Sequence, residues 1–387
     1  MRFEMNIHYP ADETEKSARR MKAYREMRRA DRIPVGLCIV PRFFAKAMHI
    51  TYSDVFKDAD TQYELLLMFQ KYQIENIRSD MLTSTTLHIH PYFDNVSTAS
   101  HFGGHVEWPE NETLQAVPVI KTVEEMNAFS IPDPEAGLFG TIISWWRRMK
   151  ELAADTRITF DGVPGKVEVP HLNLMPLGPH MIAVDLVGTN FYWWCVEYPN
   201  ECREFLGKIT SGLIEAEEHA RVIDPRPAAY DAYGLAEDSS TIMSEDMFRE
   251  FAVPYDRILY NRFGKRVRSM HMCGPSLHLH SALVDELKIT DFDVFGYQVP
   301  PEKAAVTMGG RVRLFGNINP MLMLNGTAED VRREALTTLE HLGPLGGYCM
   351  GDGANVCPGT PPENIAAMTE ACEKYASGHP ELFEDTI

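Results

Sequence analysis

The segment VRSMHMCGP, residues 267–275, joins a strand-like apolar alternation to two side chains that bind transition metals. In a strand, residues two apart face the same side, so the His271 imidazole and the Cys273 thiol are expected to point at one spot. Imidazole and thiolate together form a ligand set that suits zinc. Gly274 and Pro275 predict the end of the strand. On spacing alone, a buried histidine and a buried cysteine at a strand end remain the commoner explanation of an H-x-C pair.

Predicted strands alternate with predicted helices on both sides of this segment. The strands are expected at residues 34–40, 83–89, 166–174, 228–235, 267–273, 289–296, 312–318 and 347–350. The main helices are expected at residues 12–30, 53–72, 179–186, 200–222, 244–263, from 276 onward, 328–341 and 361–375. This alternation indicates βα units around a parallel sheet. About eight such units predict an α/β fold of the (β/α)8 barrel (TIM barrel) type, as one domain over residues 1–387.

Two additions to the barrel are predicted, an N-terminal helix and an irregular β-hairpin insertion within residues 103–121. Barrels of this type keep functional side chains at the carboxyl ends of their strands, which is where His271 and Cys273 are expected.

Composition narrows the classes of partner. The chain has 387 residues and a net charge of −18, which argues against nucleic acid and anionic membranes as partners. Its seven cysteines are scattered and odd in number, which favours a reducing compartment with free thiols or a metal site. The N-terminal residues lack an apolar signal region, and no apolar run approaches the length of a membrane span. We therefore expect a cytoplasmic protein, either a monomer or a homodimer.

Three groups of motifs stand out in the chain. They are MSEDMFREFAVPY (243–255) with HMCG (271–274), LFGNINP (314–320) with NGTAEDV (325–331), and GGY (346–348) through PPENI (361–365). Together, these motifs resemble the uroporphyrinogen decarboxylase superfamily. The early RIPV (32–35) and residues 103–134 fit the same superfamily, so the resemblance covers nearly the whole chain. It implies a single (β/α)8 barrel with its site in the barrel mouth.

The superfamily has two main branches. One decarboxylates uroporphyrinogen without a cofactor, and the other comprises zinc-dependent methyltransferases that work with corrinoid proteins, including coenzyme M methylating enzymes and O-demethylase components. The decarboxylases resemble one another in an R-Q-A-G-R stretch, whereas VPRFF (40–44) here has one arginine. A substrate with many carboxylates needs several guanidinium groups. The methyltransferase branch is favoured, with a decarboxylase of uroporphyrinogen or a related small acid, or a non-catalytic binding barrel, as alternatives.

The resemblance leaves the third zinc ligand open. The methyltransferases usually carry a late cysteine in a P-G-C loop, and the matching position here is Ala354. Cys349 and Cys357 are possible substitutes nearby. Glu237 follows the strand before the His271 strand, and carboxylates serve as ligands in some O-demethylase methyltransferases. We expect Zn²⁺ to be bound by His271, Cys273 and Glu237, with Cys349 as the weaker candidate; the first three are the predicted catalytic residues.

The activity implied by the resemblance is methyl transfer between a small substrate and a corrinoid protein. Zinc would act as a Lewis acid on a substrate oxygen or sulfur, and cobalamin on the partner protein would exchange the methyl group. The mixed ligand set favours an ether oxygen, as in a methoxylated aromatic. Asp238, Tyr297 and His88 are predicted to contact the substrate.

Overall fold

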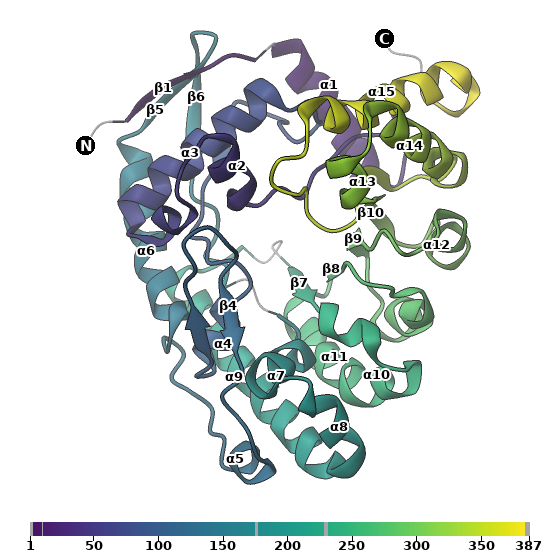
Figure 1. Ribbon diagram of the computed structural model, residues 1–387. Coiled ribbons are helices and arrows are strands. Elements are labelled where there is room, and N and C mark those ends of the chain that lie inside the picture. The colour runs from purple at the N-terminus through teal and green to yellow at the C-terminus, as the bar shows by residue number, and fades with distance from the viewer. Residues whose placement is uncertain (1–2, 10, 175–176, 228–230, 384–387) are drawn as a thin grey trace.

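The second half of the chain builds a five-stranded parallel sheet with the order β11-β10-β9-β8-β7 (Figure 1). Its strands are β7 (Ala232–Ala236), β8 (Val267–Met272), β9 (Asp291–Phe295), β10 (Arg313–Ile318) and β11 (Tyr348–Asp352). The computed structural model describes residues 3–9, 11–174, 177–227 and 231–383. All four strand pairs are parallel, so the carboxyl ends of these strands meet at one edge. The predicted parallel sheet is therefore confirmed, although residues 228–230 of one predicted strand lie outside the described residues.

Helical segments follow these strands and lie along one side of the sheet (Figure 1). They are α10 (Glu245–Phe251), α11 (Val253–Phe263), η3 (Leu277–Leu279), η4 (Ala282–Leu287), α12 (Pro301–Met308), α13 (Pro320–Asn325), α14 (Ala328–Leu342), α15 (Pro362–Gly378) and η5 (Pro380–Leu382). The single helix predicted over 244–263 is broken at Ala252, because Pro254 has no N–H to donate to the preceding turn. The helix predicted from residue 276 is instead a 3₁₀ turn followed by a π-helical segment.

The first half of the chain contains a four-stranded sheet with the order β1-β5-β6-β2 and a separate hairpin. The strands are β1 (Glu4–Ile7), β2 (Thr86–His88), β3 (His105–Glu107), β4 (Gln115–Val117), β5 (Arg157–Phe160) and β6 (Val163–Glu168). The antiparallel pair of β3 and β4 confirms the predicted hairpin insertion. A second antiparallel pair, β5 with β6, was not predicted from the sequence.

Helices make up most of the remaining first half. They are α1 (Ala11–Arg25), α2 (Pro41–Ala47), η1 (Tyr52–Phe56), α3 (Ala59–Asn76), α4 (Ser97–His101), α5 (Val123–Asn127), α6 (Leu138–Ala154), α7 (Pro179–Val187), α8 (Asn190–Glu197) and α9 (Pro199–Ile223), followed after β7 by the 3₁₀ turn η2 (Asp238–Ile242). The predicted N-terminal helix is present as α1. No helix among the described residues is both long and apolar enough to cross a membrane.

Single backbone bridges extend the parallel sheet at both ends. Val35 pairs with Met350 of β11, and Leu177 pairs with Ala236 of β7. The other side of Val35 bonds to Asp80 instead of to a strand: the Val35 N–H donates to Asp80 Oδ2, and the Asp80 N–H donates to the Val35 carbonyl, both at 2.8 Å. Within the described ranges, no ladder joins Val35 to β2. The pairings thus give an α/β fold with a parallel sheet, without showing the closed ring of the predicted barrel.

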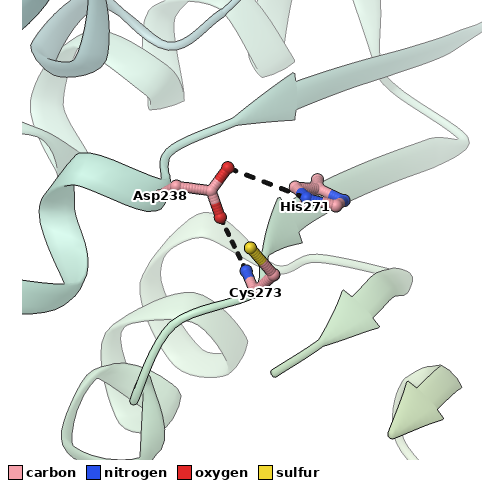
Figure 2. A group of neighbouring side chains, drawn as sticks. All are labelled: Asp238, His271 and Cys273. Carbon is pink, nitrogen blue, oxygen red and sulfur yellow. Dashed lines mark hydrogen bonds and ion pairs between the residues drawn. The ribbon is translucent and has the colours of Figure 1, made fainter. Parts of the chain in front are cut away.

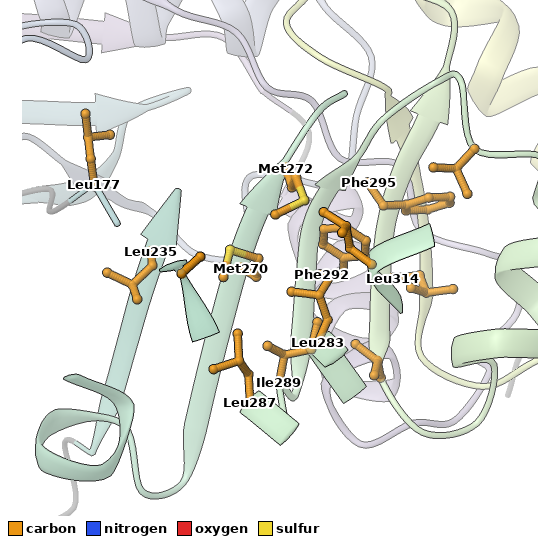
Figure 3. Close-up of a cluster of buried hydrophobic side chains, with 14 of the residues drawn as sticks. Leu177, Leu235, Met270, Met272, Leu283, Leu287, Ile289, Phe292, Phe295 and Leu314 are labelled. Carbon is orange, nitrogen blue, oxygen red and sulfur yellow. The ribbon is translucent and has the colours of Figure 1, made fainter. Parts of the chain in front are cut away.

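The outer face of the parallel sheet packs against the helices that follow the strands. Met270, Met272 and Phe292 are fully buried there, together with side chains from η4 (Figure 3). Burial of side chains of this size contributes about 1.5–3 kcal/mol each. The alternate residues of β8, Ser269 and His271, line a cavity on the opposite face. The two faces of β8 therefore fix the direction in which His271 points.

Candidate metal centre

His271 and Cys273 meet Asp238 where β8 ends and η2 begins (Figure 2). Each of the three side chains offers one metal-binding atom, and these atoms lie within 4.8 Å of one another. Asp238 Oδ1 accepts a hydrogen bond from the Cys273 N–H at 2.6 Å, and Asp238 Oδ2 lies 3.7 Å from His271 Nε2. All three residues are partly exposed, so the group is accessible from outside the core.

Local backbone structure brings the three residues together. The register of β7 and β8 places Ala236 opposite His271, so the chain leaves β7 beside the end of β8. The β8–β9 ladder is irregular between His271 and Met272, which shifts the end of β8 relative to its neighbour. Gly274 then passes so close to Thr241 that an added Cβ would overlap its side chain. The turn after β8 is thus packed directly against η2, which carries Asp238.

A cavity of about 750 Å³ opens beside this group, and His271 lines it. Aromatic side chains, including Phe44 and Phe69, form part of the wall, and Asn95 and Asn355 provide neutral polar groups. The cavity is therefore large enough for a small organic molecule and is lined by both apolar and hydrogen-bonding groups.

Ionisable side chains in and around the group have raised pKa values. Burial and, to a smaller extent, the neighbouring Asp238 together raise the pKa of the Cys273 thiol to about 12. Burial raises the pKa of Asp293, which faces the cavity, and the nearby His271 opposes part of this rise. Burial also raises the pKa of Asp352 to about 7, although the Cys38 N–H opposes this shift. A bound cation would compensate these carboxyl groups and favour the thiolate, so the donor set fits Zn²⁺.

Glu237, the expected third ligand, does not lie with the group in the structure. It is fully buried; its Oε1 accepts the His180 N–H at 3.2 Å, and its Oε2 accepts the Ser240 hydroxyl at 2.7 Å. The Glu237 N–H still donates to the His271 carbonyl at 3.0 Å, so the residue continues the strand pairing of β7. Its side chain therefore points away from His271, and the next residue, Asp238, takes the place expected for Glu237.

Cys349 also lies apart from the group. It is fully buried in β11, where its Sγ is 3.2 Å from the position that a Cβ on Gly36 would occupy. Burial raises the pKa of its thiol well above the usual value, and Asp80 adds to the effect. Cys357, the other late cysteine, lines the cavity but is not among the three grouped side chains.

The predicted substrate contacts differ in their placement. His88 lines the cavity and lies 4.0 Å from Glu168. The Tyr297 N–H donates to the Gly353 carbonyl at 3.2 Å, and Tyr297 is outside the set of residues that line the cavity. Asp238, predicted as a substrate contact, lies with the metal-binding side chains.

Sequence reasoning missed several polar residues that line the cavity, among them Cys38 and Asp293. Asp293 lies opposite His271 in the β8–β9 ladder, and the alternation of the predicted strand 289–296 could have identified it. Cys38 lies within the first predicted strand, 34–40, and had no comparable signal.

A buried acid, Asp256 of α11, lies close enough to Glu237 to interact with it. Neither oxygen of Asp256 has a hydrogen-bond partner within the described part of the chain. Burial raises its pKa well above the usual value, and Glu237 raises it further. In the folded protein the Asp256 carboxyl group therefore stays neutral at a pH where the same group in the unfolded chain is ionised. Its contribution to the free energy of unfolding is complete below about pH 4 and is lost as the pH rises.

We expect Asp256→Asn to remove this loss of stability at higher pH, because the asparagine amide stays neutral at every pH. The free energy of unfolding of the variant should rise relative to the parent between pH 5 and pH 8, by at most about 1.4 kcal/mol per pH unit. Urea unfolding at several pH values measures the difference. Parallel stability curves for the two proteins would contradict the prediction.

Residues 16–375 match the family model described as uroporphyrinogen decarboxylase (URO-D). The chain belongs to this family. A curated relative, the uroporphyrinogen decarboxylase of Danio rerio, is 26% identical over 190 residues, which cover 47% of this chain and 49% of that protein. The methylcobamide:CoM methyltransferase MtaA of Methanosarcina barkeri is 28% identical over 209 residues, covering 51% of this chain and 56% of that protein. The chain thus spans about half the length of each of these URO-D family relatives.

A solved structure, described as a methyltransferase from Methanosarcina mazei, has the same fold. It matches with a TM-score of 0.66 and covers 93% of this chain and 98% of that chain, at 18% sequence identity. This likeness supports the α/β architecture of the URO-D family member. It leaves the activity to be argued from the site.

Proposed function

We propose that this URO-D family member is a zinc-dependent methyltransferase that moves a methyl group between a small substrate and a corrinoid protein. The observation that carries the proposal is the convergence of Asp238, His271 and Cys273, whose donor atoms lie within 4.8 Å of one another beside the cavity. The resemblance to MtaA, a methylcobamide:CoM methyltransferase, supports the same activity. We further propose that residues 1–387 form one (β/α)8 barrel with this group at its mouth.

The three side chains would hold the ion, and Asp238 has a second task. The Asp238 carboxylate also accepts the Cys273 N–H, which fixes the turn on which the thiol sits. Zinc in this position would supply Lewis-acid activation of a substrate oxygen or sulfur. The aromatic part of the cavity wall, with Phe44 and Phe69, would pack against the substrate and exclude water.

The donor set also favours one substrate class. A carboxylate in place of a second thiolate donates less electron density to the metal, which would remain more electrophilic. This suits an ether oxygen, which is a poor leaving group, better than a thiol. We therefore propose small methyl ethers, including methoxylated aromatics, as methyl donors and cobalamin on a partner protein as the acceptor.

Decarboxylation of uroporphyrinogen is the second candidate, because the family model and several relatives carry that name. The two arginines that line the cavity argue against it. Arg42 is paired with Glu112, and Arg226 with Glu217 at 2.8 Å. Both guanidinium groups are thus already committed to carboxylates of the protein, whereas a polycarboxylate substrate needs several that it can bind.

The test is methyl transfer to cob(I)alamin by the purified, zinc-loaded protein, followed as the absorbance change to methylcobalamin. A panel of small methyl ethers and methyl thioethers would serve as donors, and we expect turnover with ethers. Removal of zinc with a chelator should stop the reaction, and added zinc should restore it. Equal rates with and without metal, or metal-independent decarboxylation of uroporphyrinogen in a parallel assay, would refute the proposed function.

A further inference from the structure

A closed ring of hydrogen bonds next to Asp238 joins Glu237, His180 and Ser240. All three residues are fully buried, and none lines the cavity. Glu237 Oε1 accepts the backbone N–H of His180 at 3.2 Å, and Glu237 Oε2 accepts the Ser240 hydroxyl at 2.7 Å. The ring closes between Ser240 Oγ and His180 Nδ1, which are 3.0 Å apart.

The direction of each bond follows from the number of protons available. The Ser240 hydroxyl has one proton and donates it to Glu237, so the third bond must be donated by the Nδ1–H of His180. Both carboxylate oxygens of Glu237 are then occupied. Because the Glu237 side chain is also fully buried and does not line the cavity, these bonds give it the role of an anchor.

The ring fixes the segment that carries Asp238. Glu237 and Ser240 flank Asp238 in the chain, and the Ser240 N–H donates to the Glu237 carbonyl at 3.0 Å. The Thr241 hydroxyl donates to the Asp238 carbonyl at 2.8 Å, and the Tyr192 hydroxyl from α8 donates to the neighbouring Ser239 carbonyl at 2.6 Å. The backbone around Asp238 is therefore held by hydrogen bonds, and those of the ring itself are buried.

We propose that Glu237, His180 and Ser240 are positioning residues, which act through Asp238 to set the affinity and geometry of the metal centre. The inference rests on the proposed function, since it requires that Asp238 binds the metal. Groups that orient a metal ligand commonly change metal affinity by 10–100-fold when they are removed. A ring that only stabilised the fold would leave the geometry at the metal unchanged.

The experiment compares Ser240→Ala with the parent protein in two measurements, the Kd for Zn²⁺ and the absorption spectrum with Co²⁺ in place of Zn²⁺. We expect zinc to bind about 10–100-fold more weakly. The ligand-field and thiolate-to-cobalt bands should shift, because Asp238 no longer holds one orientation. Ser240→Thr, which keeps the hydroxyl, should restore both values toward those of the parent.

Two further variants make the result decisive. Ser97→Ala removes a buried serine hydroxyl elsewhere, and it should leave both the zinc Kd and the cobalt spectrum unchanged. Glu237→Gln keeps the side-chain volume and should weaken zinc binding as Ser240→Ala does, so a folding defect in one variant does not prevent the test.

The outcomes separate the two proposals. Parent-like zinc affinity and cobalt spectrum in both Ser240→Ala and Glu237→Gln would overturn the positioning role and leave the metal centre intact. A parent protein that binds neither metal would overturn the proposed function, and the inference with it.

Discussion

Cys273→Ser should strip zinc from the protein and abolish methyl transfer while the fold persists. The thiolate is the softest of the three donors, and a serine hydroxyl does not ionise in the same range of pH. Only Asp238 and His271 would remain as side-chain ligands. Because removal of a group that merely orients a ligand costs 10–100-fold in metal affinity, loss of the ligand itself should cost more than about 100-fold.

The measurement is bound zinc per chain after dialysis, together with the Kd and the urea unfolding midpoint of the metal-free protein. The midpoint should stay close to that of the parent, because Cys273 is partly exposed beyond the end of β8 and serine has nearly the same shape.

Cys357→Ser is the matched control, since it makes the same chemical change at a cysteine that lines the cavity but lies outside the group of Asp238, His271 and Cys273. Cys349→Ala tests the ligand first considered as an alternative. Both controls should retain zinc. If either one loses the metal while Cys273→Ser keeps it, the assignment of Cys273 as a ligand is wrong.

The sequence predicted the face of β8 on which His271 lies, but it did not predict that Asp238, and not Glu237, would lie beside His271 and Cys273. His271 faces the cavity because strand alternation leaves no other direction once Met270 and Met272 are buried. The choice between Glu237 and Asp238 depends on the residue at which strand pairing stops. A shift of one residue moves a side chain to the other face, and no sequence pattern marks that point.

Cys349 illustrates the same limit at another strand. The strand was predicted to end at Met350, which would have put Cys349 next to the carboxyl edge. In the structure β11 continues to Asp352, so Cys349 lies three residues before its end, about 10 Å along the strand. The closed ring of the barrel was likewise predicted from strand count. The strand pairings do not show it, since the Val35 N–H donates to the Asp80 side chain and not to a neighbouring strand.

Gly178→Ala is the second large effect that we expect, and its cause is steric. Gly178 lies before α7 with φ −70° and ψ 152°, a conformation open to any residue. An added Cβ, however, would overlap Oε1 and Cδ of the buried Glu237 side chain. Glu237 cannot yield without breaking its bonds to His180 and Ser240. We expect a loss of about 2–4 kcal/mol in the free energy of unfolding, from overpacking and from unmade bonds of a buried carboxylate.

Urea unfolding of the metal-free protein measures this loss, and Gly207→Ala in α9 provides the control. No atom lies within 4 Å of a Cβ added at Gly207, so alanine there should be neutral or stabilising by up to about 1 kcal/mol. The double variant Gly178→Ala/Glu237→Ala should be less destabilised than the sum of its parts, because removal of the Glu237 side chain makes room for the new methyl group. Strict additivity, or a parent-like midpoint for Gly178→Ala alone, would mean that the contact between Gly178 and Glu237 does not hold the turn before Asp238.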